Sequence, residues 1–237
     1  MLVAPVLKTV ALALTITVGN GALAPPHVPE AKERYNSSKL GTMGRVLLFE
    51  GHRVIFWLVG ITEAAAAFST SDLCPRRIRR LISALLAAPT IGALSPTFMT
   101  GICLIITGSL LRRYCYRVLG QYFTFELSVR NDHKLVTSGP YSVVRHPSYV
   151  GCICVAVGEV LCCFNRNSWL VASSGLFPRD EATLTRVLWS LRVLVLALFR
   201  LMFIRMNNED AMLEKAFGDE WRAWVERVPY RLVPGVY

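Results

Sequence analysis

The apolar residues of this 237-residue chain gather into long blocks separated by polar segments, and this pattern constrains the fold most. A helix that crosses a bilayer needs about 20 mostly apolar residues, or fewer where neighbouring helices shelter it. Because a bilayer offers the backbone no hydrogen-bond partners, such blocks predict helices. The sequence therefore predicts an all-α, polytopic transmembrane helical protein with about six spans, within a range of roughly five to seven. The candidate spans are residues 3–24, 46–68, 79–94, 97–111, 149–165 and 186–204.

Composition favours the same class and argues against a nucleic-acid-binding protein. Hydrophobic residues make up 53% of the chain, more than is usual for a soluble domain of this length. The net charge of +10 comes from basic residues that cluster beside the apolar blocks, without a nucleic-acid recognition motif. We interpret these clusters as topology signals and contacts to anionic headgroups of the lipid bilayer, and expect no nucleic acid as partner. The seven cysteines show no Cys-x-x-Cys spacing, so we expect neither a metal site nor a disulfide framework.

The distribution of basic residues predicts an orientation in the membrane. If six spans alternate, the segments 69–80, 112–148 and 205–237 share one side and carry 15 basic residues together. The segments 25–45 and 165–186 lie on the other side and carry 7. Because basic residues are retained on the cytosolic side, the first three segments are predicted to face the cytosol.

Two features of the apolar blocks have more than one interpretation. Ala22–Ala24 resembles a signal-peptidase site after the first block, but Lys8 interrupts that block. The sequence favours a first span over a cleaved signal. Glu63 and Glu159 lie deep within later blocks, where a carboxyl group indicates either a functional residue or a structural hydrogen bond.

The polar segment His133–Tyr149 separates two apolar blocks and has its own local structure. Ser138–Pro140 predicts a turn, because proline fixes φ and glycine permits unusual backbone angles. Pro147 suits the first position of a helix, which places His146 and the first free amides of that helix at the membrane surface. Such a helix start binds anionic or polar groups of a ligand. Alone, the segment fits a helix cap with interfacial tyrosines equally well.

The polar segment Arg205–Tyr237 is predicted to be helical and amphipathic. Gly218 followed by Asp219 predicts that one helix ends and another begins. Arg205 and Glu209 are four residues apart and share a helix face, where they could form an ion pair or bind the carboxylate of a substrate. For the tryptophans we favour a position at the membrane interface. The amphipathic stripe is Leu213, Phe217, Trp221, Trp224 and Val228.

Together, the two segments resemble the isoprenylcysteine carboxyl methyltransferase family, over about Leu94–Tyr237. The ending Val228–Pro234 is most similar to fungal members. The resemblance divides the chain into N-terminal transmembrane segments, 1–93, and a methyltransferase catalytic region, 94–237. The elements that carry it are His133-x-Leu135-Val136, Gly139-x-Tyr141, Arg145–Gly151, Glu209-Asp210 and Phe217-Gly218.

The resemblance implies a methyl transfer from S-adenosylmethionine to the C-terminal carboxylate of a prenylated cysteine in CaaX-processed proteins, with the prenyl group either farnesyl or geranylgeranyl. It implies a multi-pass protein of the endoplasmic reticulum membrane, with its active site facing the cytosol. The substrate contacts of the family fall on Arg205 and Glu209, and Asp210 stands where glutamate is common. Glu126 stands where better-known members have glutamine. The contacts to S-adenosylmethionine fall on His133, Lys134, Leu135, Val136, Tyr141, His146, Pro147, Ser148, Tyr149 and, with that difference, Glu126.

The residue types suit this chemistry. A carboxylate is already ionised near pH 7, so its methylation needs no general base. The protein has to align the carboxylate with the methyl group and exclude water, and Arg205 could supply that alignment. A soluble methyltransferase would show a glycine-rich turn between a strand and a helix. Gly19-x-Gly21 precedes two prolines instead, so no such fold is expected.

Three other functions remain as alternatives. A phospholipid N-methyltransferase has a similar C-terminal pattern but takes an amine acceptor. An amine gives Arg205 a less obvious role than a carboxylate does. A sterol reductase that uses NADPH shares the architecture but usually has more spans. A non-enzymatic membrane scaffold or transporter would use these motifs only as interfacial anchors. A transporter would be favoured by two inverted halves, and the sequence shows no internal repeat.

Overall fold

A computed structural model describes residues 3–23, 51–86, 94–123 and 134–236 of the chain. Throughout these ranges the regular structure is helical and no strand occurs, which confirms the all-α prediction for this part of the chain. The long helices are α1 (Val3–Leu23), α3 (Gly51–Ser69), α5 (Pro96–Leu119), α6 (Pro147–Cys163) and α8 (Glu181–Phe217). The shorter ones are α4 (Arg76–Leu86), α7 (Trp169–Ala172), α9 (Asp219–Arg227) and the 3-10 turns η3 (Gly120–Tyr122) and η4 (Gly139–Ser142).

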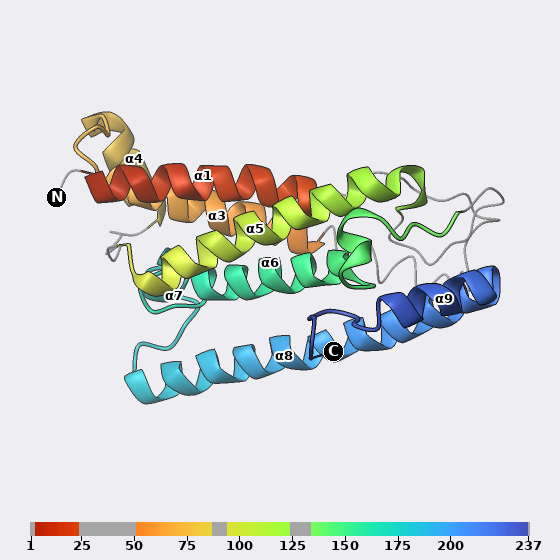
Figure 1. The fold of residues 1–237 in the computed structure, drawn as a ribbon. Helices are drawn as coiled ribbons and strands as arrows, with labels where there is room; N and C mark the ends of the chain where they lie inside the picture. Colours follow the sequence, from red (N-terminus) through yellow and green to blue (C-terminus); the bar gives the residue numbers. More distant parts are fainter. Residues whose placement is uncertain (1–2, 24–50, 87–93, 124–133, 237) are drawn as a thin grey trace.

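The long helices lie roughly alongside one another and give the bundle two ends (Figure 1). One end, here the site end, holds η4, the start of α6 and the last turns of α8. The opposite end, the far end, holds α4 and α7. A hydrogen bond from the indole Nε1 of Trp169 to the carbonyl oxygen of Leu86, 2.9 Å long, joins α7 to α4 there.

This arrangement differs from the predicted one at the third candidate span, 79–94. Helix α4 begins at Arg76 and ends at Leu86, and α5 starts from the same end of the bundle (Figure 1). The segment that carries Arg76–Arg80 therefore lies at the far end, although the sequence analysis placed it on the same side as 112–148 and 205–237. The physical reason is that a helix crossing the bilayer has to be apolar around its whole circumference. The arginines along one face of α4 do not meet this requirement.

Within the described ranges, one helix has both the length and the apolar composition needed to cross a membrane. This helix is α8, and only 6% of its most apolar window is buried inside the protein. Residues Ala4–Gly19 and Pro147–Cys163 form apolar helices of shorter length. The exposed apolar surface of α8 is what a helix facing lipid presents.

Helices α5 and α6 approach so closely that only glycine fits between them. A Cβ atom on Gly108 would lie 2.5 Å from the carbonyl oxygen of Gly151, and one on Gly158 would lie 2.6 Å from that of Gly101. In a bilayer the lipid is as apolar as the side chains, so helices associate mainly through close packing. Small residues at the interface allow the two backbones to approach this closely. This glycine seam, Gly101, Gly108, Gly151 and Gly158, fixes the register of the two helices.

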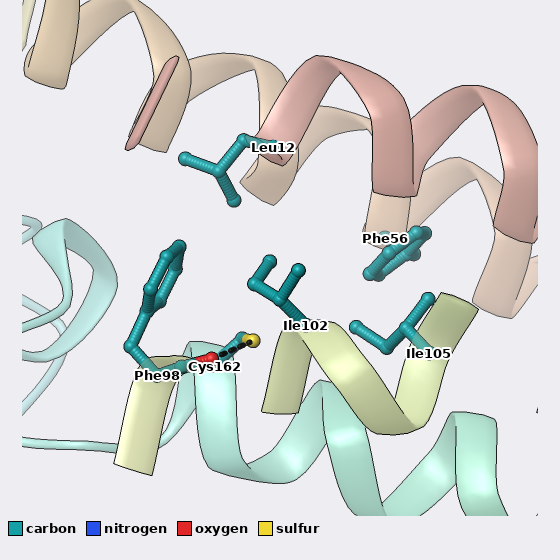
Figure 2. Packing of buried hydrophobic residues seen from close by; sticks show 6 residues of the cluster. All are labelled: Leu12, Phe56, Phe98, Ile102, Ile105 and Cys162. Carbon is teal, nitrogen blue, oxygen red and sulfur yellow. Dashed lines mark hydrogen bonds between the residues drawn. The ribbon is translucent and has the colours of Figure 1, made fainter. Parts of the chain in front are cut away.

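A buried apolar cluster holds four of the long helices together (Figure 2). Leu12 of α1 and Phe56 of α3 meet Ile102 and Ile105 of α5, and Ile105 is only 1% exposed. Phe98 and Cys162 close the cluster, with the Cys162 thiol 3.7 Å from the carbonyl oxygen of Phe98. The cluster lies toward the far end, so the site end depends on other contacts.

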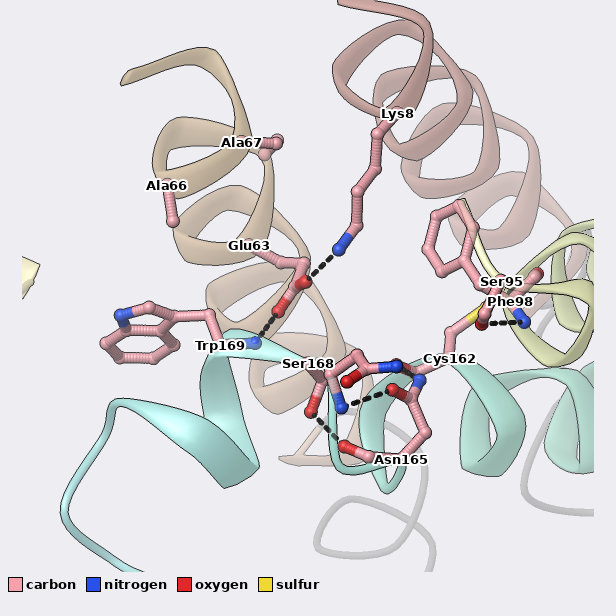
Figure 3. Close-up of polar contacts among 12 residues, drawn as sticks. Lys8, Glu63, Ala66, Ala67, Ser95, Phe98, Cys162, Asn165, Ser168 and Trp169 are labelled. Carbon is pink, nitrogen blue, oxygen red and sulfur yellow. Dashed lines mark hydrogen bonds and ion pairs between the residues drawn. The ribbon is translucent and has the colours of Figure 1, made fainter. Parts of the chain in front are cut away.

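Lys8 and Glu63 form a buried ion pair between α1 and α3 (Figure 3). The ammonium nitrogen lies 2.8 Å from one carboxylate oxygen, and the two residues are 3% and 5% exposed. The backbone N–H of Trp169 donates to the other carboxylate oxygen. Glu63 therefore has a structural hydrogen-bonding role, one of the two interpretations that the sequence allowed.

Replacing Lys8 with methionine should reduce the free energy of unfolding by about 3–5 kcal/mol, because Glu63 would keep a buried charge without its cation. Thermal unfolding of the purified protein in detergent measures this loss. The double variant Lys8→Met/Glu63→Gln should recover most of it, since no unpaired charge remains. Thr17→Val, an exposed change on α1, is the matched control. A Lys8→Met protein as stable as this control would show that the ion pair contributes nothing.

Candidate functional site

The glycine seam brings Arg112 of α5 to the start of α6. Arg112 follows Gly108 by one helical turn, and its guanidinium donates from Nη1 to the carbonyl oxygen of Ser148 at 3.0 Å and to its Oγ at 3.1 Å. Nη2 of the same side chain donates to the hydroxyl of Tyr116 at 2.8 Å. Arg112 is only 6% exposed. The first turn of α6 is thus held in place by a buried cation.

The residues before α6 pair with the C-terminal segment through their backbone. The amide of Arg145 donates to the carbonyl oxygen of Tyr230, and the amide of His146 donates to that of Arg231, both at 2.9 Å. Pro147 occupies the first position of α6, as predicted. His146 precedes it as the N-cap residue without a capping side-chain bond. The segment after α9 turns back toward this point (Figure 1).

Asp210 of α8 joins this backbone pairing to the helix that carries Arg205. Its Oδ1 lies 2.9 Å from Nε2 of His146, and its Oδ2 lies 3.2 Å from both Nη1 of Arg145 and Nε of Arg231. Asp210 is 5% exposed. Burial alone would raise the pKa of this carboxyl, but the hydrogen bond from His146 and the nearby positive charges outweigh it and lower the pKa. We call Asp210, Arg145, His146 and Arg231 the Asp210 cluster.

Arg205 and Glu209 meet through Tyr149, which comes from the other polar segment. Nε of Arg205 donates to the Tyr149 hydroxyl at 2.8 Å, and that hydroxyl donates to Oε2 of Glu209, also at 2.8 Å. The Tyr149 ring also makes an edge contact with His146, with the ring centroids 5.6 Å apart. The two polar segments therefore form one continuous site.

Aromatic residues of α9 pack under η4. Trp224 donates from its indole nitrogen to the carbonyl oxygen of Tyr141 at 3.1 Å, and it is only 2% exposed. The prediction that Trp224 lies at the membrane interface is therefore wrong, because its stripe faces the protein. Burial is the main cause that raises the pKa of the Tyr141 hydroxyl well above its ordinary value, so this group stays protonated. Leu135 and Val136 pack against an apolar cluster formed by Cys115, Tyr141, Trp224 and Val228.

The structure brings together seven of the residues that the sequence proposed for the cofactor or substrate. His146, Pro147 and Ser148 are buried at the start of α6, Tyr141 is buried in η4, and Lys134 is exposed. His133 and Glu126 lie outside the described residues. The seven in or around the first turn of α6 are Tyr141, His146, Pro147, Ser148, Tyr149, Arg205 and Glu209.

Sequence reasoning missed the basic residues that hold the site together. Arg112 was counted only among the basic residues that set the orientation, and Arg145 and Arg231 were otherwise named only as parts of family motifs, without partners. A signal for Arg112 was present, because Gly101 and Gly108 are spaced like Gly151 and Gly158. Antiparallel pairing of these glycines would have predicted Arg112 next to Ser148. No local pattern marks Arg231, whose partner Asp210 lies far away in the sequence.

Comparison with known proteins gives matches over the region that contains the start of α6. Residues 100–177 match the sequence model of the isoprenylcysteine carboxyl methyltransferase (ICMT) family. Protein-S-isoprenylcysteine O-methyltransferase B of Arabidopsis thaliana is 29% identical over 131 residues, which is 54% of this chain and 55% of that protein. Protein-S-isoprenylcysteine O-methyltransferase A of the same plant is 36% identical over 130 residues, 54% of this chain and 55% of that protein.

A fungal relative matches a similar share of the chain. Protein-S-isoprenylcysteine O-methyltransferase of Schizosaccharomyces pombe is 33% identical over 124 residues, 52% of this chain and 43% of that protein. The aligned part of this chain thus spans about half the length of the curated relatives that it matches. These matches confirm the resemblance seen in the sequence, and the family that this chain matches is that of the isoprenylcysteine carboxyl methyltransferases.

Proposed function

We propose that this protein transfers a methyl group from S-adenosylmethionine to the C-terminal carboxylate of a prenylated cysteine in CaaX-processed proteins. The relatives carry names that specify this acceptor. The observation that carries the proposal is the contact of Arg205 with Tyr149, 2.8 Å long. It joins a cation suited to a substrate carboxylate to the segment proposed for the methyl donor.

The start of α6 suits a donor that is both charged and aromatic. Its first turn presents the positive end of the helix dipole, which favours the carboxylate of an amino-acid group. The rings of His146 and Tyr149 lie in edge contact at this turn, and Nδ1 of His146 is the ring nitrogen that Asp210 does not use. Bound here, the donor would supply a sulfonium-activated methyl group. Lys134–Val136 and Tyr141 would line the same region, and His133 and Glu126 stay proposed contacts.

On the acceptor side, the protein needs to hold an anion and exclude water. Arg205 presents a guanidinium that can bind both oxygens of a carboxylate. The Tyr149 hydroxyl accepts from Nε of Arg205 and donates to Glu209, and this chain of hydrogen bonds orients the guanidinium. Because the acceptor is already ionised, the residues have to align it and need not remove a proton.

The membrane explains where the prenyl tail goes. We propose five spans, the long helices α1, α3, α5, α6 and α8, with the prenyl tail reaching the site end from the bilayer. Helix α8 supports this proposal, since its apolar surface is exposed and leads to Arg205. We further propose that the protein resides in the endoplasmic reticulum with the site end in the cytosol. The segments 112–148 and 205–237 carry 11 basic residues, against 7 in 69–80 and 165–186.

An acceptor assay tests this function. Membranes that contain the protein should transfer labelled methyl from S-adenosylmethionine to a farnesylated cysteine analogue with a free carboxylate. The amide of the same analogue should stay unlabelled, because it lacks the reacting oxygen anion. Labelling of phosphatidylethanolamine in place of the analogue would make the protein a phospholipid N-methyltransferase and would reject the proposal.

A further inference from the structure

Helix α4 at the far end has two chemically opposite faces. At 100° per residue, Arg76, Arg77 and Arg80 fall on one side of the helix. The opposite side carries Ile78, Leu81, Ile82 and Leu85. The helix has no buried residue, and Leu81 and Leu85 are 60% and 72% exposed. Both faces are thus presented outward, which is unusual for a helix of a water-soluble surface.

The position of α4 argues against a transmembrane orientation, because α3 ends and α5 begins at this same end of the bundle (Figure 1). Its 11 residues give a length of roughly 16 Å at 1.5 Å per residue. The apolar core of a bilayer is about 30 Å thick. The arginines also extend along much of one face, so a crossing helix would place several of them in hydrocarbon. A helix of this type lies in the plane of the membrane interface.

Two contacts fix α4 at the level where the bundle ends. Arg79 donates from Nη2 to the carbonyl oxygen of Ser71 at 2.7 Å, which ties the first turn to the end of α3. The carbonyl oxygen of Leu86 accepts from the indole of Trp169, as described above. Tryptophan is enriched at the level of the lipid headgroups. Between these anchors, Arg76, Arg77 and Arg80 remain outside the packed part of the bundle.

We propose that α4 is a docking surface for anionic phospholipids, with Arg76, Arg77 and Arg80 contacting the headgroups and Leu81 and Leu85 inserted among the upper acyl segments. The charge complementarity supports the arginine side of this assignment. A bilayer surface accommodates both faces at once, whereas a polyanion in water would leave the apolar face exposed to solvent. The proposal concerns the far end, in the leaflet opposite the proposed cytosolic site end, and does not depend on the methyl-transfer function.

Lipid selectivity of the purified protein tests the proposal. The full-length protein in detergent is titrated with phosphatidylserine or phosphatidylcholine, and retained lipid is counted by native mass spectrometry. The wild-type protein should retain phosphatidylserine preferentially. The variant Arg76→Gln/Arg77→Gln/Arg80→Gln should bind it at least tenfold more weakly, because each arginine contributes attraction to an anionic surface. Arg79 is left in place because it holds Ser71.

A matched variant controls for the loss of charge. Arg186→Gln/Arg200→Gln/Arg227→Gln removes three exposed arginines from α8 and α9 and should keep the phosphatidylserine preference. Equal loss in both variants, or equal retention of the two lipids by the wild-type protein, would reject a site on α4.

Hydrogen exchange in lipid nanodiscs gives a second and independent measurement. Amides of 76–86 should exchange more slowly in nanodiscs with phosphatidylserine than in neutral ones, and the α4 variant should lose this difference. Exchange of 188–204 in α8 should be the same in both proteins, which shows that the variant is folded. Equal exchange rates of the α4 amides in nanodiscs with phosphatidylserine and in neutral nanodiscs would contradict the proposal.

Discussion

Replacing Arg205 with alanine is expected to reduce methylation of a farnesylated cysteine analogue by about 100- to 1000-fold, the range seen when one charge-stabilising donor is removed from an active site. The acceptor carboxylate would lose its cation, while Tyr149 would keep its bond to Glu209. Binding of S-adenosylmethionine should change by less than about fivefold, because the Asp210 cluster and Arg112 hold the start of α6 without Arg205. Steady-state kinetics and titration calorimetry measure the two effects.

Two further substitutions separate orientation from charge at this position. Arg205→Lys keeps the charge but cannot bind a carboxylate with two parallel hydrogen bonds, so it should restore only part of the activity. Arg200→Ala removes an exposed arginine of the same helix and should leave turnover unchanged. If Arg205→Ala abolished binding of the methyl donor as strongly as turnover, the proposed division between donor and acceptor contacts would be wrong.

Replacing Asp210 with alanine is expected to lower the free energy of unfolding by about 3–5 kcal/mol and to abolish binding of S-adenosylmethionine. The reason is that Arg145 and His146, which are 7% and 3% exposed, would lose the anion that compensates their burial. The start of α6 would also lose its link to α8. Asp219→Ala on α9 is the control, since its side chain is 98% exposed. Equal effects of the two substitutions would show that the Asp210 cluster is unimportant.

The lowered pKa of Asp210 predicts how this contribution depends on pH. Its carboxylate is stabilised in the folded protein, so its contribution is fully present above the ordinary aspartate pKa of about 3.9. It is lost as the pH falls through the lower pKa of the folded state. The stability advantage of the wild-type protein over Asp210→Asn should therefore be clear at pH 7 and shrink below about pH 4. Thermal unfolding at pH 7 and pH 3.5 measures it. An advantage that persists unchanged at pH 3.5 would contradict this account.

Local sequence signals predicted the boundaries of several elements correctly. Pro147 does begin α6, and the Ser138–Pro140 turn becomes η4. Gly218 has a φ of 52°, a value that favours glycine, and it separates α8 from α9 as predicted. These signals succeed because proline and glycine restrict or permit backbone angles wherever they occur.

Longer-range features could not be predicted from such signals. The stripe of α9 fits an interfacial helix as well as a buried one, and only the contact with Tyr141 decides that Trp224 faces the protein. Helix α4 was taken as part of a span because its apolar residues were counted without their direction. The partners of Asp210 are set by the packing of α8 and the C-terminal segment against the start of α6, which no local pattern records.

The contacts of the Asp210 cluster also set an order for the making of the protein. His146 leaves the ribosome well before Asp210, and its backbone partner Arg231 follows later still. Helices α5 and α6 can associate through their glycines as soon as both are in the bilayer, but the site cannot be complete until residue 231 has been synthesised. A ribosome-bound chain that stops before this residue would be inserted yet inactive. The candidate site in this fold is thus completed last, once residue 231 has joined its partner at the start of α6.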